Sequence, residues 1–344
     1  MSSTSSAEPK HRITLSPTSE PPTRGNAAAP PSSLPAAKAS RGHPTAPSDQ
    51  TNASLFFVGT ATTVLEWQGI RLLTDPNFLH AGDHVHLGPG VTGTRVTNPA
   101  VDLEDLPNID LILLSHYHAD HFDARVEASL RRDLPIVTTP HAKECLVGKK
   151  EQAEQFTQVY DLDHWETSLV TLPSIGANKP TPTIRVTGMP GKHVPPGLLS
   201  QANDLLGAVP PTNGWMLELG ASPSTGDFKS GYRIYISGDT LLIDELKEIP
   251  ARYKDQKIDL MLIHLGGTTI PGPKLPLLMV TMDAEQGVGL MKLIGADVTI
   301  PIHFDDYDVF MSPLDDFKKA VERESLGEKV VYLDRGEEYR FEVK

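Results

Sequence analysis

Three histidines and an aspartate lie within the segment Ser115–His121, whose sequence is SHYHADH. Residues two apart on an extended segment face the same way, so we expect His116, His118 and Asp120 to converge. His121 is expected to reach past them from the following turn. Imidazole and carboxylate together are preferred by zinc and shared by iron and manganese. Burying four such groups unpaired is costly, whereas a metal binds them deprotonated, so the segment predicts a site for two neighbouring cations.

The elements around this cluster predict how it is held. Residues 109–115 form a continuous apolar run, which is typical of a strand buried on both faces. A helical pattern follows over residues 122–134, and short β-rich runs occur from residue 55 onward. A later helix is predicted between Asp283, its N-cap, and Gly295, its stop. The alternation predicts an α/β fold of two sheets with helices on the outside.

The pattern His-x-His-x-Asp-His after an apolar strand resembles the signature of the metallo-β-lactamase superfamily. That resemblance implies an αββα sandwich, in which two mixed β-sheets are flanked by helices and a dinuclear metal site lies along one edge of the sheets. It also implies three further ligands, which are matched in order by His193, Asp239 and His303. The implied first metal has the ligands His116, His118 and His193, the second has Asp120, His121 and His303, and Asp239 bridges them.

The flanking motifs GTATTVLEWQGIRLLTDP and IPIHF are similar to the branch that contains the ascorbate-phosphate lactonase and the phospholipase D that cleaves N-acyl-phosphatidylethanolamine. The resemblance implies a metal-dependent hydrolase with two divalent cations. Zn²⁺ is the first expectation, with Mn²⁺ or Fe²⁺ as alternatives. The expected nucleophile is a hydroxide that bridges the metals, and Asp120 is the expected catalytic residue that orients it.

The substrate is expected to be a small molecule. Apolar residues in segments 193–211 and 268–281 favour a partly apolar ester, lactone or amide. A phosphodiesterase of the phospholipase D kind is the alternative, because Lys192, Arg95 or Lys274 could neutralise an additional phosphoryl oxygen.

Two other classes of function stay open at this point. A mononuclear iron oxygenase would keep only part of the ligand set, and the presence of His121 and His303 argues against it. A non-catalytic binding module would be expected to have lost some of the ligand residues, whereas this sequence keeps all seven.

Three residues are expected to support the site from outside the ligand set. Asp75 ends the run GIRLLTD, where it could hold a ligand histidine or form a local turn. His264 ends another apolar run and could reach the site or be a satisfied structural histidine. Lys192 adjoins the expected ligand His193 and is a candidate for the pocket.

The composition limits the remaining classes. The 344 residues carry a formal net charge of −13, which opposes a broad electrostatic grip on nucleic acid. No apolar run reaches the roughly 18 residues of a membrane span, and no secretory signal is evident, so a cytoplasmic location is expected. Residues 1–52 are rich in Pro, Ser and Ala and predict a disordered tail, which leaves residues 53–344 as the hydrolase domain.

Overall fold

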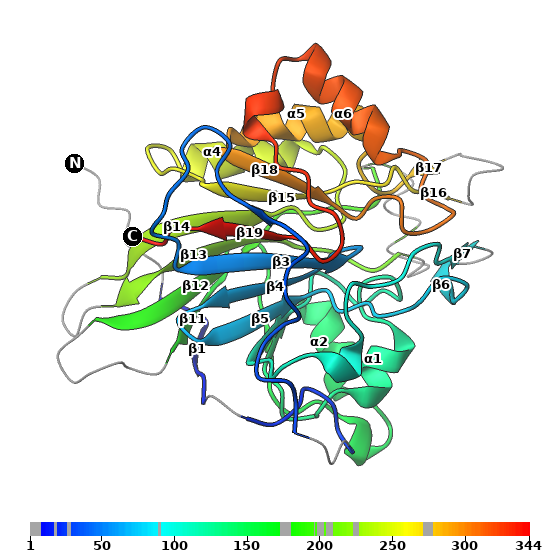
Figure 1. Ribbon diagram of the computed structural model, residues 1–344. Helices are drawn as coiled ribbons and strands as arrows, with labels where there is room; N and C mark the ends of the chain where they lie inside the picture. Colours follow the sequence, from blue (N-terminus) through cyan, green and yellow to red (C-terminus); the bar gives the residue numbers. More distant parts are fainter. Residues whose placement is uncertain are drawn as a thin grey trace.

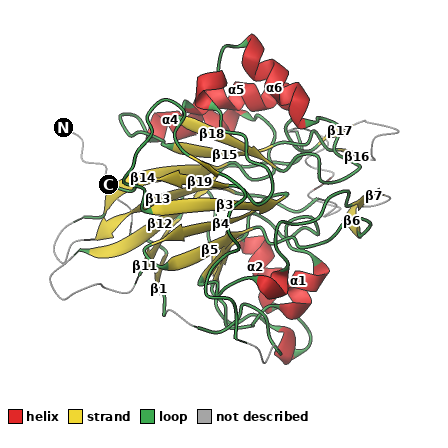
Figure 2. Ribbon diagram, in the orientation of Figure 1, coloured by secondary structure: helices red, strands yellow, loops and turns green. Residues whose placement is uncertain are grey.

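The computed structural model describes residues 8–16, 19–25, 29–88, 91–172, 180–195, 197, 203, 209–222, 227–270 and 278–344. Two sheets face each other and helices cover their outer sides, so the predicted αββα arrangement is confirmed. Figure 1 and Figure 2 show α5 and α6 on one side of the strands and α1 and α2 on the other. The helices are α1 (Ala124–Ser129), α2 (Pro140–Val147), α4 (Glu248–Arg252), α5 (Ala284–Ile294) and α6 (Leu314–Arg323).

Both sheets are mixed. In spatial order, one sheet contains β1 (His11–Thr14), β11 (Thr167–Thr171), β12 (Thr181–Met189), β13 (Gly214–Ser222), β14 (Lys229–Ile236), β15 (Leu260–His264) and β18 (Val298–Ile302). The other contains β10 (Val159–Asp161), β9 (Ile136–Thr138), β8 (Leu111–Leu113), β5 (Ile70–Thr74), β4 (Thr62–Trp67), β3 (Ala53–Gly59), β19 (Glu338–Phe341) and β2 (Ser40–Arg41). Two separate hairpins pair β6 (His84–Gly88) with β7 (Val91–Thr94) and β16 (Thr269–Ile270) with β17 (Leu278–Met279).

The core has two layers because successive strand residues face opposite sides of a sheet. On β8, Leu111 and Leu113 belong to the apolar cluster between the sheets, which also contains residues of β13 to β15. Ile112 points the other way and packs with Val126 of α1 and Leu146 of α2. The continuous apolar run predicted as a doubly buried strand is therefore a strand covered on both faces.

Helix α5 begins and ends at the predicted residues. The Asp283 carboxylate accepts a hydrogen bond from the Gln286 backbone N–H at 2.9 Å, and Gly295 adopts a left-handed φ of 67° at the end. The Gln286 side chain accepts a hydrogen bond from the Leu242 backbone N–H. Helix α5 is thereby tied to the loop that follows β14.

The N-terminal segment differs from the expected disordered tail. Strand β1 pairs in parallel with β11, and Ile13 and Leu15 are buried in the core between the sheets. Further along, β2 pairs with β19, which in turn lies beside β3 (Figure 1). The prediction from composition is wrong for these described residues because much of their ordering comes from backbone pairing with sheet edges that later residues build. Among the described residues, no helix is long and apolar enough to cross a bilayer.

Candidate metal centre

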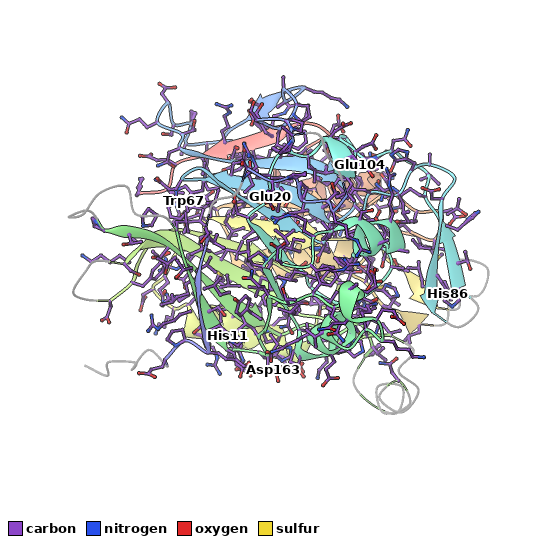
Figure 3. The ribbon with its side chains drawn as sticks, turned by 90° about the horizontal axis from the view of Figure 1, so that it is seen from below. His11, Glu20, Trp67, His86, Glu104 and Asp163 are labelled. Atoms are coloured by element: carbon purple, nitrogen blue, oxygen red, sulfur yellow. The ribbon has the colours of Figure 1, made fainter. Side chains whose placement is uncertain are left out.

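The predicted ligands follow strands that end at one edge of the two sheets. Strands β14, β15 and β18 are parallel neighbours, so Asp239 and His303 leave their strands on the same side. The 116–121 segment follows β8, which is parallel to β5. Strand β12 leads to His193. In Figure 1 the hairpins β6–β7 and β16–β17 project at one end of the molecule, and Figure 3 shows His86 on the first of them.

The 116–121 segment is a series of turns and not an extended strand, which corrects the predicted reason for its convergence. The His118 N–H donates to the His116 carbonyl at 3.2 Å, and the N–H groups of His121 and Phe122 donate to the His118 carbonyl at 3.0 and 2.8 Å. These turns gather the side chains more tightly than alternation along a strand would allow.

The structure brings all seven predicted ligand residues together. Within each of three overlapping groups, possible ligand atoms lie within 4.8 Å of one another. Six of the seven residues are buried, and His118 is partly exposed. The groups are His116, His118 and Asp120; His116, His193 and Asp239; and Asp120, His121, Asp239 and His303.

The orientation of the imidazoles fits a cation. His193 Nδ1 donates to the Val280 carbonyl at 2.9 Å, and His303 Nδ1 donates to the Leu265 carbonyl at 2.8 Å. In its neutral form each ring therefore has a lone pair on Nε2, and Nε2 of His303 lies 3.6 Å from an Asp239 oxygen. Among the described residues, His303 Nε2 and Asp239 Oδ1 are buried without a hydrogen-bond partner. A lone pair facing a carboxylate is unfavourable unless a proton or a metal ion lies between them, and the clustered imidazoles and carboxylates are a donor set that fits a bound metal.

The electrostatics of the site favour an ionised Asp239 and neutral rings at His193 and His116. At His121 and His303, burial lowers the pKa, but the neighbouring carboxylates outweigh burial and raise the pKa. Burial raises the pKa of Asp239, but His303 and His121 outweigh burial and hold that pKa well below its usual range. Burial lowers the pKa of His193 to about 4, and burial together with neighbouring imidazoles holds the pKa of His116 well below its usual value. An ionised carboxylate and neutral imidazoles are the forms that bind a metal.

His303 has a left-handed backbone conformation, with a φ of 59°. That conformation is uncommon for a residue with a β-carbon, so surrounding contacts must hold it. The His303 N–H donates to the Thr60 carbonyl at 2.7 Å. Asp306, three residues later, accepts from the Thr60 N–H at 3.0 Å and lies 3.4 Å from the buried Arg95 guanidinium.

Asp75 and His264 lie behind the predicted ligands. This is where the supporting role that was one of two predictions for each residue would place them. Asp75 accepts a hydrogen bond from the Ser115 N–H at 2.6 Å and faces Nδ1 of His121 at 3.3 Å. His264 is fully buried, with Nε2 3.7 Å from the same Asp75 carboxylate and Nδ1 3.3 Å from the Ser237 hydroxyl. Asp75 thus reaches the site through the predicted ligand His121, and His264 reaches it through Asp75.

The basic residues considered for a phosphate do not line the centre in the described part of the chain. The Lys192 ammonium pairs with Glu245, and Arg95 is buried beside Asp306. Lys274 lies outside the described residues.

A cavity of about 20 Å³ adjoins the ligands. Part of its lining comes from the predicted segments 193–211 and 268–281, whereas Leu87 and Val91 were not predicted, because isolated Leu and Val residues carry no motif. Thr281 ends the second of these segments, and its hydroxyl donates to Asp239 at 3.2 Å. The lining residues are Leu87, Val91, His118, Asp120, His193, Val209, Asp239, Thr268, Val280 and Thr281.

A sequence profile of the beta-lactamase superfamily domain matches residues 70–304, which is more than half of the chain. The chain therefore belongs to the beta-lactamase superfamily. Within that superfamily it is a metal-dependent hydrolase, as the relatives it resembles are.

Two relatives illustrate the similarity. A metal-dependent hydrolase of Archaeoglobus fulgidus is 25% identical over 257 residues, which cover 75% of this chain and 91% of the relative. An N-acyl-phosphatidylethanolamine-hydrolyzing phospholipase D of Caenorhabditis elegans is 25% identical over 297 residues, which cover 82% of this chain and 74% of the relative.

Solved structures share the fold. An isothiocyanate hydrolase from Delia radicum gut bacteria superimposes with a TM-score of 0.63 at 20% identity, covering 85% of this chain and all of the other. A diiron β-hydroxylase from Streptomyces venezuelae gives a TM-score of 0.52 at 16% identity, covering 86% of this chain and 55% of the other. At such identities the likeness establishes the fold alone.

Proposed function

We propose that this chain is a dinuclear metallohydrolase that cleaves a partly apolar ester, lactone or amide. The observation that carries the proposal is that seven predicted ligand residues, six of them buried, bring imidazole nitrogens and carboxylate oxygens within 4.8 Å of one another in overlapping groups. His116, His118 and His193 would hold one cation and Asp120, His121 and His303 the other, with Asp239 between them. Zinc is the first candidate metal for this mixture of imidazole and carboxylate.

Two divalent cations in this position supply a water of lowered pKa and a Lewis acid for a substrate oxygen. The chain's own contribution is to orient the reactants. Asp120 lines the cavity, and its carboxylate accepts a hydrogen bond from the attacking water, holding it toward the scissile carbon. Hydrolysis then forms a bond from the water oxygen to that carbon and breaks the bond to the leaving oxygen or nitrogen, which receives the proton.

The character of the cavity supports the choice of substrate class. Leu87, Val91, Val209 and Val280 supply apolar walls beside the ligands. The described lining contains no Lys or Arg side chain that could neutralise an additional negative charge. The apolar and uncharged character of these walls therefore favours an uncharged acyl group beside the ligands over a phosphodiester.

A phosphodiesterase is the second candidate, favoured by the similarity to the N-acyl-phosphatidylethanolamine-hydrolyzing phospholipase D over 82% of this chain. The same pair of cations can polarise a phosphoryl oxygen as well as a carbonyl oxygen.

Turnover of a small panel by the zinc-loaded protein tests the proposal. The panel contains a lactone, an aryl ester, a β-lactam and bis-p-nitrophenyl phosphate. We expect hydrolysis of the lactone or the ester, with a turnover rate at least about 100-fold lower in Asp120→Asn. The control Asp105→Asn, at an exposed aspartate outside the predicted ligand set, should turn over the substrate at the wild-type rate. Turnover of the phosphodiester alone would replace the first candidate by the second, and turnover of none would contradict both.

A further inference from the structure

The β16–β17 hairpin separates two cavities, so its two faces line different spaces. Thr269 pairs with Met279, and the pairing continues one residue further because the Val280 N–H donates to the Thr268 carbonyl at 2.8 Å. Successive residues of such a ribbon face opposite sides. Thr268 and Val280 accordingly line the cavity at the metal centre, whereas Thr269 and Met279 line a separate groove of about 710 Å³.

The two neighbouring threonines differ in how their hydroxyl groups are satisfied. The Thr269 hydroxyl donates to the Met311 sulfur at 3.1 Å. The Thr268 hydroxyl is buried and has no hydrogen-bond partner among the described residues. A buried hydroxyl left without a partner costs about 1–3 kcal/mol. Such a group beside a reaction site is explained if a ligand in the cavity supplies its partner.

The cavity is small, so a ligand group that hydrogen-bonds to the Thr268 hydroxyl would lie close to the predicted metal ligands. A cavity of about 20 Å³ has room for about one water-sized group. Thr268 lines this cavity together with Asp120 and Asp239, so a substrate group that enters it comes near both the Thr268 side chain and two of the predicted metal ligands.

We propose that Thr268 is a catalytic residue that donates a hydrogen bond from its hydroxyl to the substrate oxygen that gains negative charge when the scissile group is attacked. The inference rests on the proposed function, since it assigns a residue to the same hydrolysis. A donor placed for a developing charge lowers the barrier because it acts more strongly on the transition state than on the bound substrate.

Three variants separate a hydrogen bond from packing. Thr268→Val removes the hydroxyl with little change of shape, Thr268→Ser keeps the hydroxyl, and Thr269→Val makes the same change on the opposite face of the hairpin. Each zinc-loaded variant is assayed with p-nitrophenyl acetate, and its affinity for p-nitrophenyl methylphosphonate, a tetrahedral analogue, is measured by calorimetry. Zinc content and melting temperature are recorded for each.

We expect Thr268→Val to lower kcat about tenfold or more, to change KM less than about twofold, and to weaken phosphonate binding by a similar factor to the loss in kcat. Thr268→Ser should restore both values, and Thr269→Val should resemble the wild type. Wild-type kcat and phosphonate affinity in Thr268→Val would overturn the inference, as would equal losses in Thr268→Ser or no phosphonate binding by the wild type. Absence of turnover together with Thr268-dependent phosphonate binding would instead contradict the proposed function and support the role of Thr268.

Discussion

At the scale of single residues, the centre depends on which ring nitrogen each histidine presents. The carbonyls of Val280 and Leu265 hold Nδ1 of His193 and His303, and the Asp75 carboxylate faces Nδ1 of His121. These partners fix both the tautomer and the direction of each ring before any cation arrives. Metal affinity should therefore depend on side chains that never touch the metal.

His264 provides a test of that dependence. Its Nε2 lies 3.7 Å from Asp75, which orients His121. We expect His264→Asn to retain less zinc, with an affinity about 10- to 100-fold lower. Zinc retained after dialysis against a competing chelator, measured by mass spectrometry, checks this expectation. His164→Asn, at a partly exposed histidine outside the predicted ligand set, is the control, and equal retention in both variants would show that His264 is only a packing residue.

The identities of the site residues were more predictable than their geometry. The spacing of His116 to His121 indicated a metal site, and the family resemblance supplied His193, Asp239 and His303. The turn that gathers residues 116–121 depends on backbone hydrogen bonds that the ligand pattern does not specify. The ion pair between the Lys192 ammonium and Glu245 was not predictable, because only the fold brings that carboxylate near.

At the scale of elements, a buried polar network joins the loop after β7 to the loop after β18. Arg95 Nη1 donates to Asn77 at 3.0 Å, and Arg95 lies 3.4 Å from Asp306. Asp306 in turn accepts from the Thr60 N–H, next to the carbonyl that holds the His303 backbone. The network thus supports the strained backbone of a predicted ligand.

Replacement of Arg95 tests this support. We expect Arg95→Met to lower the free energy of unfolding by about 3–5 kcal/mol, because it leaves the buried Asp306 with a weaker set of partners. Chemical denaturation of the zinc-free protein measures the change. Arg335→Met removes another partner of Asp306 from a more exposed position and should cost less. An Arg95→Met variant as stable as the wild type would show that the network contributes little.

The N-terminal strand is held by a charge cluster whose effect depends on pH. Asp161 contacts Lys10 at 2.8 Å and Lys143 at 2.7 Å. Burial raises the pKa of Asp161, but the two ammonium groups outweigh burial and lower that pKa below the usual 3.8. Because the folded pKa is the lower one, this stabilisation is present above about pH 4 and is lost as the pH falls through the folded pKa.

We therefore expect Asp161→Asn to reduce stability at pH 7 by up to about 1 kcal/mol, since the pair is near the surface. The difference from the wild type should shrink as the pH is lowered below about 4. Thermal unfolding of both proteins between pH 3 and 7 checks this. A difference that stays constant over the range would assign the effect to hydrogen bonding that does not depend on charge.

At the scale of the whole molecule, the metal centre lies between segments from both halves of the chain. Residues 116–121 follow a strand of one sheet, and Asp239 and His303 follow strands of the other. Cations held by these residues would therefore connect the two sheets, and a metal that binds only the native state adds to its stability.

Removal of the metal should lower the melting temperature. A chelator is expected to shift the zinc-loaded wild type down by several degrees, because saturation at 100 times the dissociation constant is worth about 2.7 kcal/mol. The same chelator should have a smaller effect on Asp239→Asn, which lacks the central carboxylate. Differential scanning calorimetry measures both shifts, and equal curves for the wild type with and without chelator would contradict the predicted site.

The overall architecture was predictable from the sequence because each strand and helix carries its own periodicity. The continuous run at β8 and the caps of α5 are local signals that the structure confirms. The pairing of β1 and β2 was not predictable in this way, since residues 1–52 have few apolar side chains and many prolines and so resemble an unfolded segment. The order of these two strands depends on partners about 150 to 300 residues away in the sequence.

The pairing of both chain ends with the sheets has a practical consequence for anyone who shortens this protein. A fragment cut at the limits of the superfamily match, residues 70–304, would lack β1 and would also lose β3, β4 and β19 from the larger sheet. It would expose the unpaired backbone of β5 and β11, where other copies could add strands and aggregate, whereas in the intact chain β4 covers β5 and β1 covers β11.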